Sequence, residues 1–178
     1  KLESGFMNKY LPVFLDLAGK RILVIGAGPV ARQKVRQVLD AGRIPEVVAK
    51  EASPDLLKLG RQKKVKYKIR PFRDSDLQGR DIVFCATHDE VLNRRVGTLC
   101  RKKGILVNIA DRPSLCNFIM PAAVRRGGII FAVSTGGSSP AMAKYLKSKI
   151  DRVFGPEVGR LAGMLGKFRK RLLKVSME

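Results

Sequence analysis

The feature that most constrains the fold is the stretch RILVIGAGPVA at residues 21–31, an apolar run that ends in a glycine turn. It predicts a buried strand in which Gly26 turns the chain sharply into a helix. Gly28 has no side chain to keep a pyrophosphate from the backbone N–H groups, and Pro29 suits a first helical turn. Ala31, in place of the third glycine of G-x-G-x-x-G, allows close packing of helix on strand. We interpret the stretch as a dinucleotide-binding turn, the alternative being a purely structural turn.

Strand and helix patterns alternate after this turn, which indicates an α/β fold: a Rossmann-like parallel sheet with helices on both faces. Further strands are expected at 46–49, 64–69, 81–86, 104–109 and 128–133. From Pro140 onward apolar residues recur at helical spacing, and after Gly155-Pro156 they follow steps of three and four. Because such an exposed apolar stripe needs a partner, we expect a homodimer formed through residues 140–178.

The expected domain division follows these patterns. Residues 7–112 are predicted to form an NAD-binding Rossmann domain, residues 113–139 a dimerisation and substrate-crevice segment, and residues 140–178 a helical C-terminal region. We expect residues 1–6 to be an added leader ahead of a natural start at Met7.

The charge of the chain is unusual, with 36 Lys and Arg against 15 Asp and Glu, a formal net charge of +21. Such a charge attracts polyanions, so nucleic acid, an anionic membrane and a small polycarboxylate substrate compete as partners with a merely solvated basic surface. Aromatic residues make up only 6%, which gives no stacking platform for nucleic acid. No apolar run approaches the roughly 20 residues of a membrane span. Three cysteines without C-x-x-C spacing indicate reduced thiols of a cytoplasmic protein.

Loops that follow the strands supply further candidates. Lys50 and Glu51 stand where dinucleotide folds usually place the acidic residue that holds the ribose, so the pattern does not separate NAD from NADP. Thr87 and His88 follow a strand whose end should face the ligand crevice, and we expect Thr87 to line the coenzyme site. The only histidine, His88, is expected to be a loop residue rather than a catalyst.

Asp111 follows the strand expected at 104–109 and is the best candidate for proton transfer, the alternative being a turn former next to Pro113. The loop STGGSSP at 134–140 either cradles an anionic group with backbone N–H donors or links two elements as an N-cap. No set of His, Cys and Asp has metal-ligand spacing, so no resident metal is predicted.

Five blocks in the chain carry a resemblance to a known family. They are LPVFLDLAGKRILVIGAGPVARQKV, CATHDEVLN, NIADRP, NFIMPA and VSTGGSSPAMA. In this order they resemble the precorrin-2 dehydrogenase family, the N-terminal dehydrogenase and ferrochelatase module of siroheme synthase, from residue 10 to about residue 149. The resemblance implies NAD-dependent oxidation of precorrin-2 to sirohydrochlorin, in siroheme or cobalamin biosynthesis. In some members it also implies insertion of ferrous iron, which would be a substrate here.

The resemblance also implies roles for particular residues. The family's catalytic aspartate matches Asp111, and its coenzyme contacts match the glycine turn and the end of the second strand. Precorrin-2 carries acetate and propionate carboxylates, which would account for the basic charge. The expected coenzyme contacts are Gly26, Gly28, Pro29, Val30, Ala31, Lys50, Glu51 and Thr87, and the expected substrate contacts are Arg112, Asn117, Thr135, Gly136 and Ser138.

The sequence departs from the family pattern in a few places. Asn117 and Thr135 stand where many relatives have serine, and because both keep a polar group we expect adjusted substrate contacts rather than lost activity. His88 stands where aspartate is frequent. For an enzyme of this kind no nucleic-acid or membrane partner is expected. The alternative function is a non-enzymatic NAD(H)-sensing module that binds nucleic acid through its basic surface.

Overall fold

The computed structural model describes residues 9–51 and 53–175, so the leader expected at 1–6 lies outside the described residues. These residues form two compact units. The first is residues 11–119, and the second takes in residues 120–175 together with residues 9 and 10. The division falls after Ile119, within the segment 113–139, and the roles assigned to the three expected domains stay predictions.

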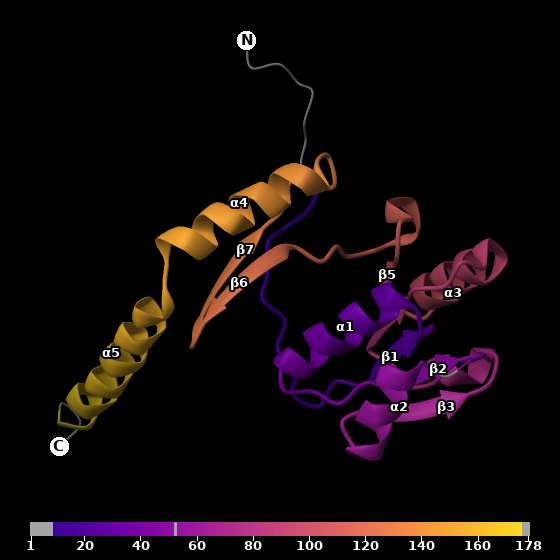
Figure 1. Cartoon of the computed structure of the whole chain (residues 1–178), viewed down its shortest axis with the longest axis horizontal. Helices are drawn as coiled ribbons and strands as arrows, with labels where there is room; N and C mark the ends of the chain where they lie inside the picture. The colour runs from indigo at the N-terminus through magenta and orange to yellow at the C-terminus, as the bar shows by residue number, and fades with distance from the viewer. Residues whose placement is uncertain (1–8, 52, 176–178) are drawn as a thin grey trace, which may run out of the picture. The chain divides into compact units, whose positions relative to one another are not determined.

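The first unit is built on a five-stranded sheet in the order β3-β2-β1-β4-β5 (Figure 1). Its strands are β1 (Ile22–Ile25), β2 (Glu46–Ala49), β3 (Lys66–Ile69), β4 (Ile82–Cys85) and β5 (Leu106–Ile109). All neighbouring pairs run parallel, which confirms the predicted Rossmann-like sheet. The chain moves outward from β1 to β3 and then returns to the other side of β1. The topological switch point therefore lies between β1 and β4.

Helices cover both faces of this sheet, as predicted. They are α1 (Pro29–Asp40), α2 (Pro54–Arg61) and α3 (Glu90–Lys102), with short 3-10 turns η1 (Asp74–Leu77) and η2 (Pro113–Leu115). Successive strand residues point to opposite faces, so each face has its own core. Val24 packs with Val35 of α1 and Leu56 of α2 on one face, and Leu23 packs with Val96 of α3 on the other.

A buried carboxylate ties η1 to the end of β3. Asp76 is only 6% exposed and accepts hydrogen bonds from the Arg70 guanidinium at 2.6 and 2.8 Å and from the Arg73 N–H at 2.8 Å. The hydrogen bonds from Arg70, helped by the one from Arg73, lower the pKa of Asp76 against the opposing effect of burial. The ionised carboxylate therefore fixes the connection that leads into β4.

The second unit contains an antiparallel hairpin and two helices. The hairpin consists of β6 (Ala122–Arg126) and β7 (Ile129–Val133), followed by α4 (Pro140–Val153) and α5 (Pro156–Val175). The strand β7 and both helices were expected from the sequence, whereas β6 was not. The signal for β6 was the Gly127-Gly128 pair directly before the apolar segment of β7, which is typical of a hairpin turn. The local fold here is therefore a strand pair rather than a single strand.

Polar and aromatic contacts join these elements within the second unit. The Arg126 guanidinium of β6 donates to the Phe154 carbonyl and to the Asp151 carboxylate, both at 2.7 Å. The Phe131 ring stacks on Phe154 with centroids 4.8 Å apart. A Cβ at Gly159 would lie 2.6 Å from the Arg126 carbonyl, so the start of α5 packs directly on the hairpin turn. Further along α5, four apolar side chains of the predicted heptad are each more than half exposed: Leu161, Leu165, Phe168 and Leu172.

The three cysteines are all free. Cys85 and Cys100 are buried, and burial raises the pKa of the Cys85 thiol to about 12 and that of Cys100 to about 11. Both thiols therefore stay protonated near neutral pH.

None of the helices in the described part of the chain has the length and apolar character needed to cross a bilayer.

Candidate functional site

Gly26 follows β1 directly and lies close to the backbone of Ala86, which follows β4, at the switch point. Its backbone φ is +113°, and an added Cβ would lie 2.3 Å from the carbonyl oxygen of Ala86, just after β4. The Gly26 N–H donates to the carbonyl of Val48 at 2.9 Å, which anchors the same turn on β2. Glycine is required here both by the left-handed backbone and by the close approach.

The start of α1 leaves backbone N–H groups available to a ligand. Gly28 is the N-cap, and no side chain accepts a hydrogen bond from the first turn. Because the first helical hydrogen bond runs from the Arg32 N–H to the Gly28 carbonyl, the N–H groups of Val30 and Ala31 have no partner within the helix. A Cβ at Gly28 would meet open space, while the Ala31 side chain is fully buried. The geometry fits a phosphate held by backbone donors and the helix dipole.

The turn after β4 is held by Asn93 of α3, which is 4% exposed. Its Oδ1 accepts hydrogen bonds from the Thr87 hydroxyl at 2.8 Å and the Cys85 thiol at 3.1 Å. Its Nδ2 donates to the Thr87 carbonyl at 3.0 Å. This buried amide sets the position of Thr87 at the carboxyl end of the sheet. His88, the next residue, is exposed in the same turn.

Asp111 follows β5 in a left-handed backbone conformation, with φ of +57°. Asp and Asn tolerate this region better than most residues, and such conformations gather at functional sites. The Asp111 side chain is exposed, and across the described residues no hydrogen bond or ion pair holds its carboxylate. The Ala110 N–H donates to the Cys85 carbonyl at 2.9 Å, which places Asp111 next to the end of β4.

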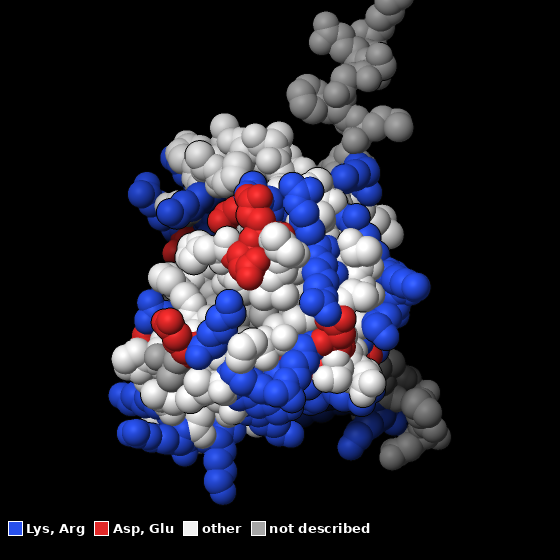
Figure 2. Space-filling model, turned by 90° about the vertical axis from the view of Figure 1, so that its right-hand side faces the viewer, with Lys and Arg blue, Asp and Glu red and all other residues white. Residues whose placement is uncertain are grey.

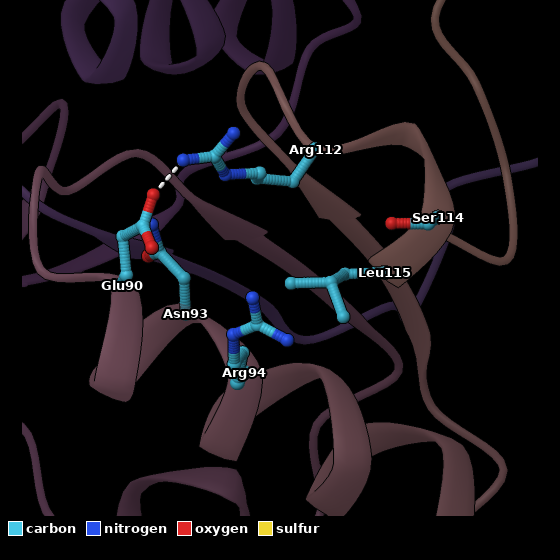
Figure 3. A pocket seen from close by; sticks show the side chains of 6 residues that line it. All are labelled: Glu90, Asn93, Arg94, Arg112, Ser114 and Leu115. Carbon is cyan, nitrogen blue, oxygen red and sulfur yellow. Dashed lines mark ion pairs between the residues drawn. The ribbon is translucent and has the colours of Figure 1, made fainter.

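Arg112 faces α3 across a small cavity of about 50 Å³. Figure 3 shows its guanidinium paired with the Glu90 carboxylate, while Arg94 points into the same space from the next turn of α3. Asn93, Ser114 and Leu115 complete the lining. The residue predicted to hold a substrate carboxylate therefore already has an anionic partner within the chain.

Residues 13–122 match the model of a protein family described as "Putative NAD(P)-binding". The chain belongs to this family. The matched region contains the whole parallel sheet and the uncapped start of α1, so the family's coenzyme class agrees with the geometry described above.

The chain is also similar to part of several siroheme synthases. The chain is 38% identical to the siroheme synthase of Pseudomonas fluorescens (strain Pf0-1) over 164 residues, which are 92% of this chain and 35% of that protein. It is 40% identical to the siroheme synthase of Thioalkalivibrio sulfidiphilus over 163 residues, 92% of this chain and 33% of that protein. The chain thus spans about a third of the length of these relatives.

One solved structure is similar to this chain over most of the length of both proteins. It is described as "SirC, precorrin-2 dehydrogenase", with a TM-score of 0.74 and 27% sequence identity. The match covers 90% of this chain and 79% of that one. Over the matched 90% of the chain, the fold is thus that of the SirC structure.

The remaining expected coenzyme contacts lie around the glycine turn. Pro29 lines a cavity of about 220 Å³ together with Arg32, Gln33, Arg36 and Asp55. Lys50 and Glu51 are exposed just after β2, and the Glu51 carbonyl accepts a hydrogen bond from the Tyr67 hydroxyl at 2.7 Å. Whether these residues contact the coenzyme stays a prediction.

Asn117 is placed at the edge of β5. Its Oδ1 accepts from the Val107 N–H at 2.7 Å, its Nδ2 donates to the Ile105 carbonyl at 2.9 Å, and its own N–H donates to the Val107 carbonyl. The amide side chain therefore has a structural role that the sequence did not reveal, and a contact with substrate stays a prediction.

The other expected substrate contacts belong to the second unit, in the loop between β7 and α4. The Thr135 hydroxyl donates to the Ser139 carbonyl and accepts from the Ser139 N–H, both at 3.0 Å. The Ser138 hydroxyl donates to the Thr135 carbonyl at 2.6 Å, and Gly136 has a positive φ of +65°. Ser139 caps α4 by accepting from the Met142 N–H. The loop is thus ordered by its own hydrogen bonds.

Three residues that shape the site were not expected from the sequence: Asn93, Glu90 and Asn108. The Nδ2 of Asn108 donates a hydrogen bond to the Phe118 carbonyl at 3.2 Å.

In the part of the chain that the structure describes, no group of three or more His, Cys, Asp or Glu residues is arranged to hold a metal ion. Lys and Arg side chains spread over much of the face drawn in Figure 2, with few acidic groups among them.

Proposed function

We propose that this chain is an NAD-dependent precorrin-2 dehydrogenase, which oxidises precorrin-2 to sirohydrochlorin in siroheme or cobalamin biosynthesis. The similarity to the SirC structure over 90% of the chain supports the substrate class. The observation that carries the reaction is the Asp111 carboxylate, exposed and without a hydrogen bond or ion pair among the described residues, beside the end of β4. A carboxylate in this crevice suits proton transfer.

The reaction removes a hydride and a proton from the macrocycle. When bound, NAD supplies the hydride acceptor. The Gly28 turn and the N–H groups of Val30 and Ala31 hold the diphosphate, and Gly26 keeps β1 and β4 close enough for the crevice to form. Asp111 accepts the proton and releases it to water, so the products are sirohydrochlorin, NADH and a proton.

Substrate binding follows from charge. The net charge of +21 steers a polycarboxylate toward the protein. Arg112 is a proposed carboxylate contact that must exchange Glu90 for a substrate group. Asn117, Thr135, Gly136 and Ser138 stay proposed contacts on the strength of the family resemblance. We also propose that the chain works as a homodimer, through the apolar side chains of α4 and α5.

The first test is Asp111→Asn, because asparagine keeps the left-handed backbone but accepts no proton. We expect the rate of NADH formation from precorrin-2 to fall about 100-fold or more, with the Kd for NADH unchanged. Asp40→Asn, an exposed carboxylate at the opposite end of α1, is the control and should keep full activity. Equal rates for Asp111→Asn and the wild type would contradict the assignment.

The same preparation distinguishes the other functions. Adding ferrous iron after sirohydrochlorin has formed tests the chelation that the family resemblance implies, with siroheme absorbance as the readout. A parallel reaction with NADP measures coenzyme preference, and we expect NAD to be preferred. A non-enzymatic NAD(H) sensor would instead bind DNA in a salt-dependent way, respond to NADH and be indifferent to Asp111.

A further inference from the structure

Lys34 is a half-buried lysine in the second turn of α1, on the helix that begins at the glycine turn. Throughout the described residues no hydrogen bond or ion pair involves its ammonium group. Most lysines of this chain are exposed, where water solvates the charge. Lys34 therefore differs from them in being partly desolvated without an anionic partner, which is unfavourable for a cation.

The surroundings of Lys34 place it on one face of the sheet near the end of β5. Its ammonium lies over the Phe84 ring of β4, 5.7 Å from the centroid. Phe84 is paired with Asn108 of β5, and its ring meets the Phe118 ring edge to face at 5.7 Å. An aromatic ring attracts the cation but leaves its hydrogen-bond donors unsatisfied. The Lys34 side chain thus packs on the Phe84 ring, close to Asn108 of β5, three residues before Asp111.

Electrostatics agree with this placement. Burial lowers the pKa of Lys34, while the negative charge of Cys116 when ionised and that of the Asp111 carboxylate act in the opposite direction. Both of these groups come from the segment that follows β5, so the ammonium and the proposed catalytic carboxylate share one local field. Since neither group forms an ion pair with Lys34, the cation can still accept an anionic ligand.

We propose that Lys34 binds one carboxylate of the tetrapyrrole substrate beside Asp111, and so orients the macrocycle for reaction. This inference rests on the proposed function. The coenzyme is the less suitable partner for two reasons. Its diphosphate is held at Gly28, six residues and about 9 Å back along the helix. Its oxidised nicotinamide ring carries positive charge, which a lysine repels.

The experiment compares Lys34→Met and Lys34→Gln with the charge-retaining Lys34→Arg. We expect both neutral variants to raise KM for precorrin-2 about 10- to 100-fold, with kcat within about threefold of the wild type. The Kd for NADH should not change, and Lys34→Arg should recover most of the affinity. Lys102→Met is the matched control, because Lys102 is exposed at the far end of α3.

A binding measurement separates this inference from the proposed function. The Kd for sirohydrochlorin, measured by fluorescence quenching without turnover, should weaken by the same factor in both neutral variants. If the wild type forms no NADH from precorrin-2, the proposed function fails, and the sirohydrochlorin titration alone decides on Lys34. The role of Lys34 is overturned if a folded neutral variant binds sirohydrochlorin with unchanged affinity, or if only its affinity for NADH is reduced.

Discussion

A single methyl group tests the geometry of the switch point. In Gly26→Ala the new Cβ would meet the Ala86 carbonyl at 2.3 Å on a backbone with φ of +113°. We expect unfolding in denaturant to show a loss of about 1–3 kcal/mol, together with loss of NADH binding.

Gly28→Ala is the matched control for this substitution. Its added methyl group meets open space, and its backbone is in an ordinary extended conformation, so stability should stay close to that of the wild type. NADH binding should still weaken, because the methyl group occupies the approach of the diphosphate. Equal destabilisation by the two substitutions would contradict the geometric argument.

At the residue scale, the sequence was sufficient where a local backbone conformation favours one type of residue. Gly26 and the helix start at Pro29 follow from the rules for tight turns, and they are found in those conformations. Asn93 and Lys34 were missed as contributors to the site. Asn117 was expected to contact substrate, but its hydrogen bonds along β5 were not foreseen. These roles depend on which strand or ring each side chain meets in three dimensions. A polar residue within a helical pattern carries no sign of its tertiary partner.

Among the elements, the link between η1 and β3 gives a prediction on pH. The folded-state pKa of Asp76 is lowered, chiefly by its hydrogen bonds to Arg70. Its stabilising effect is therefore present above the unfolded pKa of about 3.9 and is lost as the pH falls through the folded value. Asp76→Asn should lower the free energy of unfolding by about 1.5–3 kcal/mol at pH 7 and reduce the acid sensitivity below about pH 4.

Asp74→Asn serves as the control for that measurement. Asp74 pairs with Arg95 at 2.6 Å, but both side chains are exposed, so the change should cost less than about 1 kcal/mol. Denaturant unfolding of the three proteins at several pH values compares them directly. An equal effect of the two substitutions would show that burial of Asp76 is not what makes its ion pair important.

The elements themselves were predicted best where hydrophobic pattern and turn chemistry agree. Strands such as β1 and β4 are short apolar runs buried on both faces, and α1 has a proline at its start and Gly42 just past its end. β6 was missed because AAVRR is neither an apolar run nor an alternating one, and its residues are mostly half-buried. Pairing with β7, rather than local pattern, makes it a strand.

The whole molecule is expected to be a dimer. Four heptad side chains of α5 are more than half exposed in the single chain, namely Leu161, Leu165, Phe168 and Leu172, and covering them would remove apolar surface from water. Light scattering should give twice the mass of the chain, and Leu165→Asp should give a monomer, because a carboxylate in the centre of the seam would be desolvated. Lys170→Asp, outside the seam, should stay dimeric. A monomeric wild type would contradict this proposal.

At this scale the sequence was least informative about partners. A net charge of +21 attracts any polyanion and identifies none of them, which is why composition left nucleic acid, membrane and polycarboxylate open. The five ordered blocks reduced these partners to a polycarboxylate tetrapyrrole, because they resemble those of the precorrin-2 dehydrogenase family. The distribution of expected substrate contacts over both units was not evident, since compact units depend on long-range packing.

The amide of Asn117 has a consequence for behaviour at high concentration. It and the Cys116 thiol occupy hydrogen-bonding positions along the outer side of β5, the last strand of the sheet. Open strand edges invite pairing with other chains and so promote aggregation. These two side chains therefore hinder the addition of a strand from another molecule at β5. The loop that carries them, just after the proposed catalytic carboxylate, thus also lowers the tendency of the protein to aggregate.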